Sequence, residues 1–252
     1  MTGPASLTAS SSNNLPPGHG PEHTLHPEAP LTEPSTPTLV AFLAVVAFAA
    51  LAPVVAWGRW AEGRWPAALG WLSLWLFLSG APSALGLFQA DNLVPRLPIF
   101  MVTMVVITTA VAFSSLGTRL AQTPLPWLVA YQGFRFPLEL VLHAWVDEGV
   151  VPPQMTWTGP NVDILSGLIC LGCAPLLGRF PRLAWLPATV GFVLLLNVIR
   201  VVIQSLPTPM QRYEEPVLLA LSFPEVWIAS VCVAGAWLVH LVTFRALWKA
   251  RA

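Results

Sequence analysis

The sequence predicts an all-α integral membrane protein, and three observations support this fold class. The 252 residues are 55% hydrophobic and only 10% charged, whereas soluble domains carry about 25% charged residues. Apolar runs recur along the chain, each near the length of about 20 residues that a helix needs to cross about 30 Å of hydrocarbon. A soluble fold of this size could not bury that much apolar surface. We therefore expect a multi-pass protein.

The beginning of the chain differs in composition from the rest. Residues 1–35 are rich in Pro, Ser, Thr and Gly and contain neither Lys nor Arg. Such a segment buries too little apolar surface to offset the entropy cost of ordering it. The sequence therefore predicts a disordered extracytoplasmic tail over residues 1–35 and a transmembrane helical domain over residues 36–252.

Seven apolar segments are expected to form the spans of this domain. The fourth and the sixth contain charged residues away from their ends and are assigned from their length and context. The segments are residues 37–57, 66–88, 97–117, 124–145, 160–178, 183–206 and 224–247.

Basic residues set the expected orientation, because Lys and Arg accumulate in cytoplasmic loops. With the N-terminus outside and the C-terminus in the cytoplasm, eight basic residues fall inside and two fall outside. The inner set is Arg59, Arg64, Arg119, Arg179, Arg182, Arg245, Lys249 and Arg251, and the outer set is Arg96 and Arg212. This arrangement predicts an inner-membrane protein with this orientation.

Polar residues form one stripe along the expected span 124–145. Gln132, Arg135, Glu139 and His143 follow one another at helical spacing, so they share a face of the helix. Arg135 lies about 17 Å along the helix, near mid-bilayer. A charge at that depth costs about 2.5–3.5 kcal/mol on insertion scales. The stripe must therefore face protein or water.

A second stripe lies on span 183–206, and polar residues also begin span 160–178. The topology brings both to the outer side, which predicts an outward-facing polar cavity between the fourth, fifth, sixth and seventh spans. Guanidinium groups suit carboxylate or phosphate oxygens, so we expect the cavity to bind or move a polar or lipid-linked anionic group. The expected ligand-binding residues are Arg135, Glu139, His143, Asn161, Asp163, Asn197, Arg200 and Gln204.

Other interpretations of these residues remain open. Ion pairs between Arg135 and Glu139 and between Arg200 and Asp163 would lock helices together without any ligand. Arg200 alone could extend its head to the outer interface. The protein would then be a scaffold within a membrane complex.

The sequence predicts lipid and protein partners and no cofactor. Cys170 and Cys173 form a C-x-x-C pattern inside an apolar helix, where a packing role is expected and no metal site. Nucleic acid is excluded because the chain has no basic patch to displace counterions. The expected partners are membrane lipids, with a lipid-linked or anionic small molecule and another membrane protein as alternatives.

The stretch from Gln132 to Phe244 resembles a group of bacterial multi-span membrane proteins with no assigned activity, so this resemblance implies topology alone. The shared features are Arg135-x-Pro137-x-Glu139, Gln154-Met-Thr, Gly159-Pro-Asn161-Val-Asp163-Ile and Pro207-Thr-Pro209.

A second set of residues resembles exosortases, the membrane-embedded cysteine transpeptidases. The shared features are Ser166-Gly167, Asn197-Val-Ile-Arg200 and a histidine, His240, on a later helix, which we expect near the inner face. The family has a cysteine before Ser-Gly, where this chain has Leu165, so the covalent step lacks its nucleophile. The resemblance implies a divergent processing enzyme in which only Arg200 keeps a role, as an oxyanion or carboxylate binder.

Overall fold

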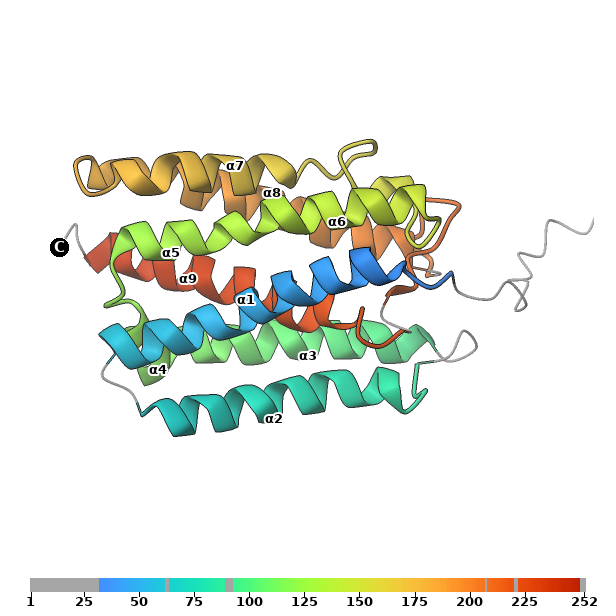
Figure 1. Cartoon of the computed structure of the whole chain (residues 1–252), viewed down its shortest axis with the longest axis horizontal. Helices are drawn as coiled ribbons and strands as arrows, with labels where there is room; N and C mark the ends of the chain where they lie inside the picture. Colours follow the sequence, from blue (N-terminus) through green and yellow to red (C-terminus); the bar gives the residue numbers. More distant parts are fainter. Residues whose placement is uncertain (1–31, 62–63, 89–92, 207, 220–221, 250–252) are drawn as a thin grey trace, which may run out of the picture. The chain divides into compact units, whose positions relative to one another are not determined.

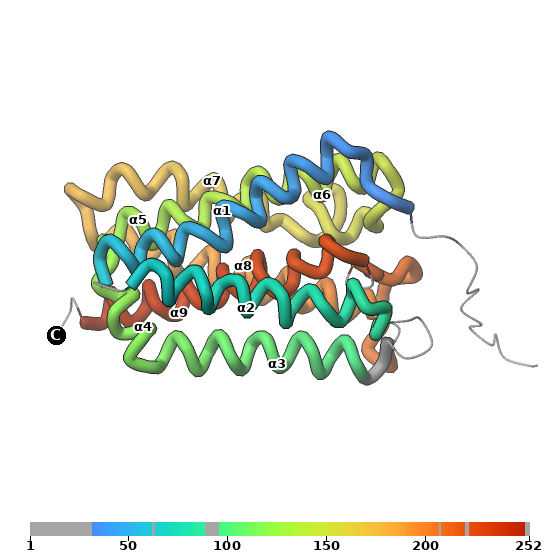
Figure 2. The backbone as a smooth tube through the Cα atoms, turned by 60° about the horizontal axis from the view of Figure 1, so that its bottom comes forward, coloured from blue at the N-terminus to red at the C-terminus, as the bar shows by residue number. Residues whose placement is uncertain are grey.

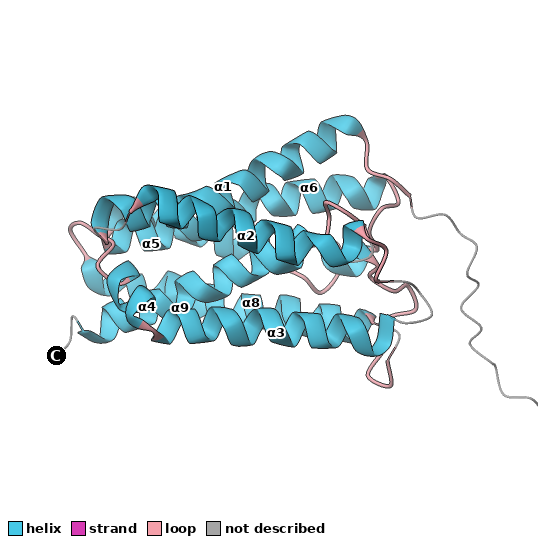
Figure 3. Ribbon diagram, turned by 90° about the horizontal axis from the view of Figure 1, so that it is seen from below, coloured by secondary structure: helices cyan, strands magenta, loops and turns pink. Residues whose placement is uncertain are grey.

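The structure is a computed structural model that describes residues 32–61, 64–88, 93–206, 208–219 and 222–249. The chain divides into a segment Met1–Pro30 and a unit Leu31–Ala252, and only the second contains described residues. Most of the expected tail, residues 1–31, lies outside them. Within the described ranges every regular element is helical (Figure 3), so the predicted all-α fold is confirmed there.

Five helices in the described part are long and apolar enough to cross a membrane. Each coincides with one of the expected spans. They are α1 (Thr36–Trp60), α2 (Trp65–Ala84), Arg96–Phe113 within α3 (Leu93–Phe113), Pro181–Ser205 with the turn η4 (Pro181–Ala184) and α8 (Trp185–Ser205), and Ile228–Lys249 with the π-helix η6 (Ile228–Val233) and α9 (Ala234–Lys249).

The expected fourth and fifth spans are built from shorter pieces. The fourth consists of α5 (Leu125–Tyr131), a 3₁₀ turn η1 (Gln132–Phe134) and α6 (Arg135–Asp147). The fifth is α7 (Ile164–Cys173) with the turn η3 (Ala174–Leu176), and a single turn η2 (Pro153–Met155) precedes it. α7 begins later than the predicted residue 160, because the Asn161 side chain accepts the backbone N–H of Asp163 at 3.1 Å and forms a turn there.

The expected third span, residues 97–117, also divides. α3 ends at Phe113, and Ser114 then caps the short helix α4 (Ser115–Leu120) by accepting the N–H of Leu116 at 3.1 Å. The Arg245 guanidinium donates to the carbonyls of Ala112 and Ser114. A cation at these carbonyls, in and just after the last turn of α3, stabilises the end of this helix.

The long helices run roughly along a common direction, with their connections at the two ends (Figure 1). α7 packs on α8 and α6, and α3 packs on α9. α1 runs obliquely to the other long helices (Figure 2). It contacts both α2 and α6. The segments that carry the polar stripes, α6, α7 and α8, are therefore neighbours.

Two irregularities in the apolar helices are satisfied by side chains from other helices. Pro53 has no N–H, so the carbonyl of Ala49 loses its usual partner within α1. The Tyr131 hydroxyl donates to that carbonyl at 3.0 Å. In the π-helix η6, the Trp75 indole N–H donates to the Ser230 carbonyl at 2.9 Å. These bonds hold α5 against α1 and α2 against η6.

α6 and α7 are in close contact at Gly167. A Cβ atom there would overlap the backbone N of Phe136 and lie 2.7 Å from its Cβ. The backbone of Phe136 cannot yield as a flexible side chain would. Only glycine therefore allows the present separation of α6 and α7.

We predict that Gly167→Ala destabilises the bundle by about 1–3 kcal/mol, the usual cost of overpacking. The matched control is Gly172→Ala on the same helix, where a Cβ atom would meet nothing within 4 Å. The free energy of unfolding in detergent micelles is measured for both variants and for the wild type. Equal stability of the two would show that the α6–α7 contact is not close.

The Glu148 carboxylate ties the end of α6 to the start of α1. It accepts the backbone N–H of Ser35 at 3.0 Å, the Ser35 hydroxyl at 2.7 Å and the Thr38 hydroxyl at 3.0 Å. An anion at a helix N-terminus is also favoured by the helix dipole. The N–H and hydroxyl of Ser35 hold the pKa of Glu148 below its ordinary value of 4.5.

Because this pKa is lowered in the folded chain, the tie adds stability above pH 4.5 and is lost as the pH falls through the folded-state value. We predict that acid lowers the protection factors of the first amides of α1, which compare the observed exchange rate with the intrinsic rate at the same pH. Glu148→Gln should show low protection factors already at neutral pH, whereas the exposed control Glu214→Gln should behave as wild type. Protection factors of the wild type that stay constant in acid would contradict this tie.

Candidate functional site

Arg135 is the centre of a buried polar network. Its side chain is 2% exposed, and its guanidinium pairs with both oxygens of Asp163. Nε donates to Asp163 Oδ2 at 2.6 Å, and Nη2 donates to Asp163 Oδ1. Nη1 donates to the Gly191 carbonyl at 2.8 Å and lies 3.2 Å from His240 Nε2. Arg135 on α6 is therefore contacted by Asp163, directly before α7, and by residues of α8 and α9.

Asn161 connects this pair to Glu139. Its amide nitrogen donates to Glu139 Oε1 at 2.8 Å and to the Met155 carbonyl at 2.7 Å. Its oxygen accepts the N–H of Asp163. Glu139 is also 2% exposed, and its Oε2 has no hydrogen-bond partner in the described part of the chain. Four of the expected residues thus form one connected network.

His240 is the residue that the sequence analysis misplaced. It was expected near the inner face, and the structure instead buries it against Arg135. Gly191 leaves the room for this contact, because a Cβ atom there would lie 2.9 Å from His240 Cε1. A single histidine within an apolar run was the available signal. Its partner lies on a different helix, and residue spacing cannot reveal that.

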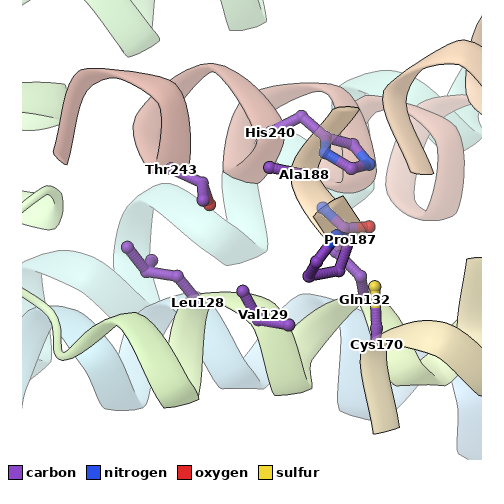
Figure 4. A pocket seen from close by; sticks show the side chains of 8 residues that line it. All are labelled: Leu128, Val129, Gln132, Cys170, Pro187, Ala188, His240 and Thr243. Carbon is purple, nitrogen blue, oxygen red and sulfur yellow. The ribbon is translucent and has the colours of Figure 1, made fainter. Parts of the chain in front are cut away.

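A narrow space adjoins the network on the side of α5 and α9. His240, Gln132, Cys170 and Pro187 gather at one end of it, while Thr243 and Leu128 lie at the other (Figure 4). It does not admit a water-sized sphere. The network is therefore closed on this side in the present conformation.

The second expected stripe forms a separate group on α8. Asn197 donates to the Pro160 carbonyl at 2.9 Å. Arg200 donates to the side-chain oxygen of Asn197 at 2.8 Å and to that of Gln204 at 3.4 Å. Arg200 is exposed. Its partners are neutral, so its charge is unbalanced within the described residues.

The prediction of ion pairs between Arg135 and Glu139 and between Arg200 and Asp163 is wrong. Arg135 pairs with Asp163, and neither Arg135–Glu139 nor Arg200–Asp163 forms. The predicted stripes are present, but the relative positions of the helices place Asp163 beside Arg135 and not beside Arg200. His143, the last expected site residue, stacks instead on the Trp157 ring at 4.2 Å between centroids and is not hydrogen-bonded to the network.

An apolar groove lies between α3, α8 and the η6–α9 helix. It has a volume of about 310 Å³. Ile199 and Ile203 line it on either side of Arg200 in the sequence, and Met101 and Met104 face them from α3. Methionine is adaptable and suits surfaces that accept flexible apolar chains.

Comparison with protein-family models, curated proteins and solved structures gives no match. The geometry of the Arg135 network and of the Arg200 group on α8 is therefore the basis for a functional interpretation.

We predict that the Arg135–Asp163 pair is strongly coupled. Asp163→Asn leaves a buried guanidinium without its carboxylate, and Arg135→Met leaves the carboxylate alone, so each should cost about 3–5 kcal/mol. The double variant should cost less than the sum of the single changes. The free energies of unfolding of wild type, the two single variants and the double variant, measured in micelles, give this cycle.

Arg200→Met is the control for that cycle, because its guanidinium is exposed and has no carboxylate partner among the described residues. It should stay within about 0.5 kcal/mol of wild type, as surface changes usually do. Additive costs for Arg135→Met and Asp163→Asn would show that the pair does not hold the helices together.

Proposed function

We propose that this chain is a multi-pass protein of a bacterial inner membrane that binds the anionic head of a lipid or lipid-linked molecule in the outer leaflet. The observation that carries the proposal is the unbalanced charge of Arg200. Arg135 has its cationic head engaged by Asp163, Gly191 and His240. Of the two intramembrane guanidiniums, Arg200 is therefore the one available to an outside anion.

The position of Arg200 suits a lipid head. Val193 and Leu196 precede it on the same face of α8, and both are exposed apolar residues. Such a face meets hydrocarbon in a membrane. Arg200 lies about 7.5 Å before Ser205, where α8 ends. The guanidinium therefore stands where acyl chains give way to head groups.

The groove beside α8 supplies a place for the apolar part of the ligand. Its walls are the apolar side chains of α3, α8 and the η6–α9 helix. Ile199 and Ile203 bring it within one turn of Arg200. An amphiphile would place a phosphate or carboxylate on Arg200 and a hydrocarbon chain along Ile199 and Ile203.

The proposed topology has seven spans with the N-terminus outside. The α1–α2 connection, α4, the α7–α8 connection and the end of α9 share one end of the bundle (Figure 1). In the described part, that end carries Arg59, Arg64, Arg119, Arg179, Arg182, Arg245 and Lys249. Positive charge favours the cytoplasmic side, so the opposite end faces out and Arg200 belongs to the outer leaflet.

A scaffold is the second candidate, and the closed Arg135 network favours it. Buried pairs of this kind specify how helices meet, as in other bundles. The exosortase-like alternative has less support. Leu165, at the position of the family's cysteine, is 48% exposed, and Cys170, a turn further on, is 1% exposed. Neither offers a reactive thiol beside Arg200.

We predict that Arg200→Gln weakens retention of phosphatidylglycerol by about 10- to 100-fold, since a hydrogen bond to a charged group contributes about 1.5–3 kcal/mol. Native mass spectrometry of protein released from nanodiscs gives the retained fraction. The matched control is Arg212→Gln, another exposed arginine of the outer end.

Changing the lipid and adding inorganic phosphate identify the ligand. Nanodiscs of phosphatidylcholine alone should give weaker retention, and added inorganic phosphate should compete only if the head group suffices without the chain. Equal retention of phosphatidylglycerol by wild type and Arg200→Gln would refute the proposal.

A further inference from the structure

Glu139 is a buried carboxyl group without a cation. Arg135 lies one turn away on the same helix, yet its guanidinium pairs with Asp163 and makes no ion pair with Glu139. The only hydrogen bond that Glu139 receives within the described residues comes from the Asn161 amide, at 2.8 Å. Its Oε2 is buried and unpartnered.

The charges around Glu139 do not offset a carboxylate. On α6 the neighbours are Arg135, already neutralised, and His143, which stacks on Trp157. Asp163, directly before α7, is the carboxylate that neutralises Arg135, and His240 on α9 contacts Arg135. Three other elements pack on α6. Of these, η1 and η2 have no titratable residue, and α1 has only Arg59, in its last turn at the opposite end.

An ionised Glu139 would therefore leave one unbalanced negative charge in a buried site. That costs several kcal/mol at least, because no cation and no donor besides Asn161 reaches it among the described residues. A single proton on the carboxyl removes the charge. The Arg135–Asp163 pair and a protonated Glu139 then sum to zero.

A metal ion does not fit this site. The Asn161 amide turns its nitrogen to Glu139, and this nitrogen also donates to the Met155 carbonyl. A donor at that place repels a cation. Within the ranges that the structure describes, no three His, Cys, Asp or Glu residues gather to hold one.

We propose that Glu139 is a proton-binding site of this membrane bundle. The carboxyl holds one proton in the described conformation. It gives the proton up from Oε2 to a water molecule that reaches the carboxyl: the O–H bond breaks, the electron pair stays on the carboxylate, and the water becomes hydronium. Asn161 couples this event to Asp163, because it bonds both the Glu139 carboxyl and the Asp163 N–H.

Infrared difference spectroscopy of the full-length protein in lipid tests the proposal. The wild type at neutral pH should show the C=O stretch of a protonated carboxyl, shifted downward in D₂O. Glu139→Gln should lose that component. Glu148→Gln, at the end of the same helix, should keep it. Arg200→Gln should keep it as well, so the result is independent of anion binding by Arg200.

Two further measurements keep the outcome clear. Glu139→Asp retains a carboxyl and should retain a shifted band, so it replaces Glu139→Gln if the latter unfolds. On denaturation at neutral pH, the wild type should release one proton more than Glu139→Gln, read with an indicator dye in weak buffer. A wild-type spectrum without the band, or a band and proton count unchanged in Glu139→Gln, would overturn the proposal.

Discussion

The bidentate pair between Arg135 and Asp163 is the interaction on which the interior of this protein depends. A lone buried guanidinium is costly, and both partners of this pair are buried. The cost is offset only because Asp163, the Gly191 carbonyl and His240 together satisfy Arg135. The close approach of α6 and α7 at Gly167 makes this geometry possible.

The pair also decides what the remaining polar residues can do. Because Asp163 serves Arg135, it is not available to Arg200, which is left with the neutral Asn197 and Gln204. For the same reason Glu139 has no cation. One deep ion pair thus leaves a positive group at the surface of α8 and an acidic group inside, and these two support different kinds of chemistry.

Apolar runs were enough to predict five of the long helices, because chain length and hydropathy fix where a helix can cross hydrocarbon. Helical period also placed Arg135 and Glu139 on one face. The pairing of Arg135 with Asp163 was not predicted, since it depends on the rotation and depth of two helices relative to each other. His240 was misplaced for the same reason: its role follows from α8 and α9 meeting α6, and no local spacing records that.

The sequence separation of the central pair has a consequence for biogenesis. Asp163 follows Arg135 after a single connection, so both charges leave the ribosome within one helical hairpin. In a membrane, these two charges would already cancel within the hairpin before α8 and α9 are synthesised. The later helices would then add the Gly191 carbonyl and His240, which complete the set of partners of Arg135.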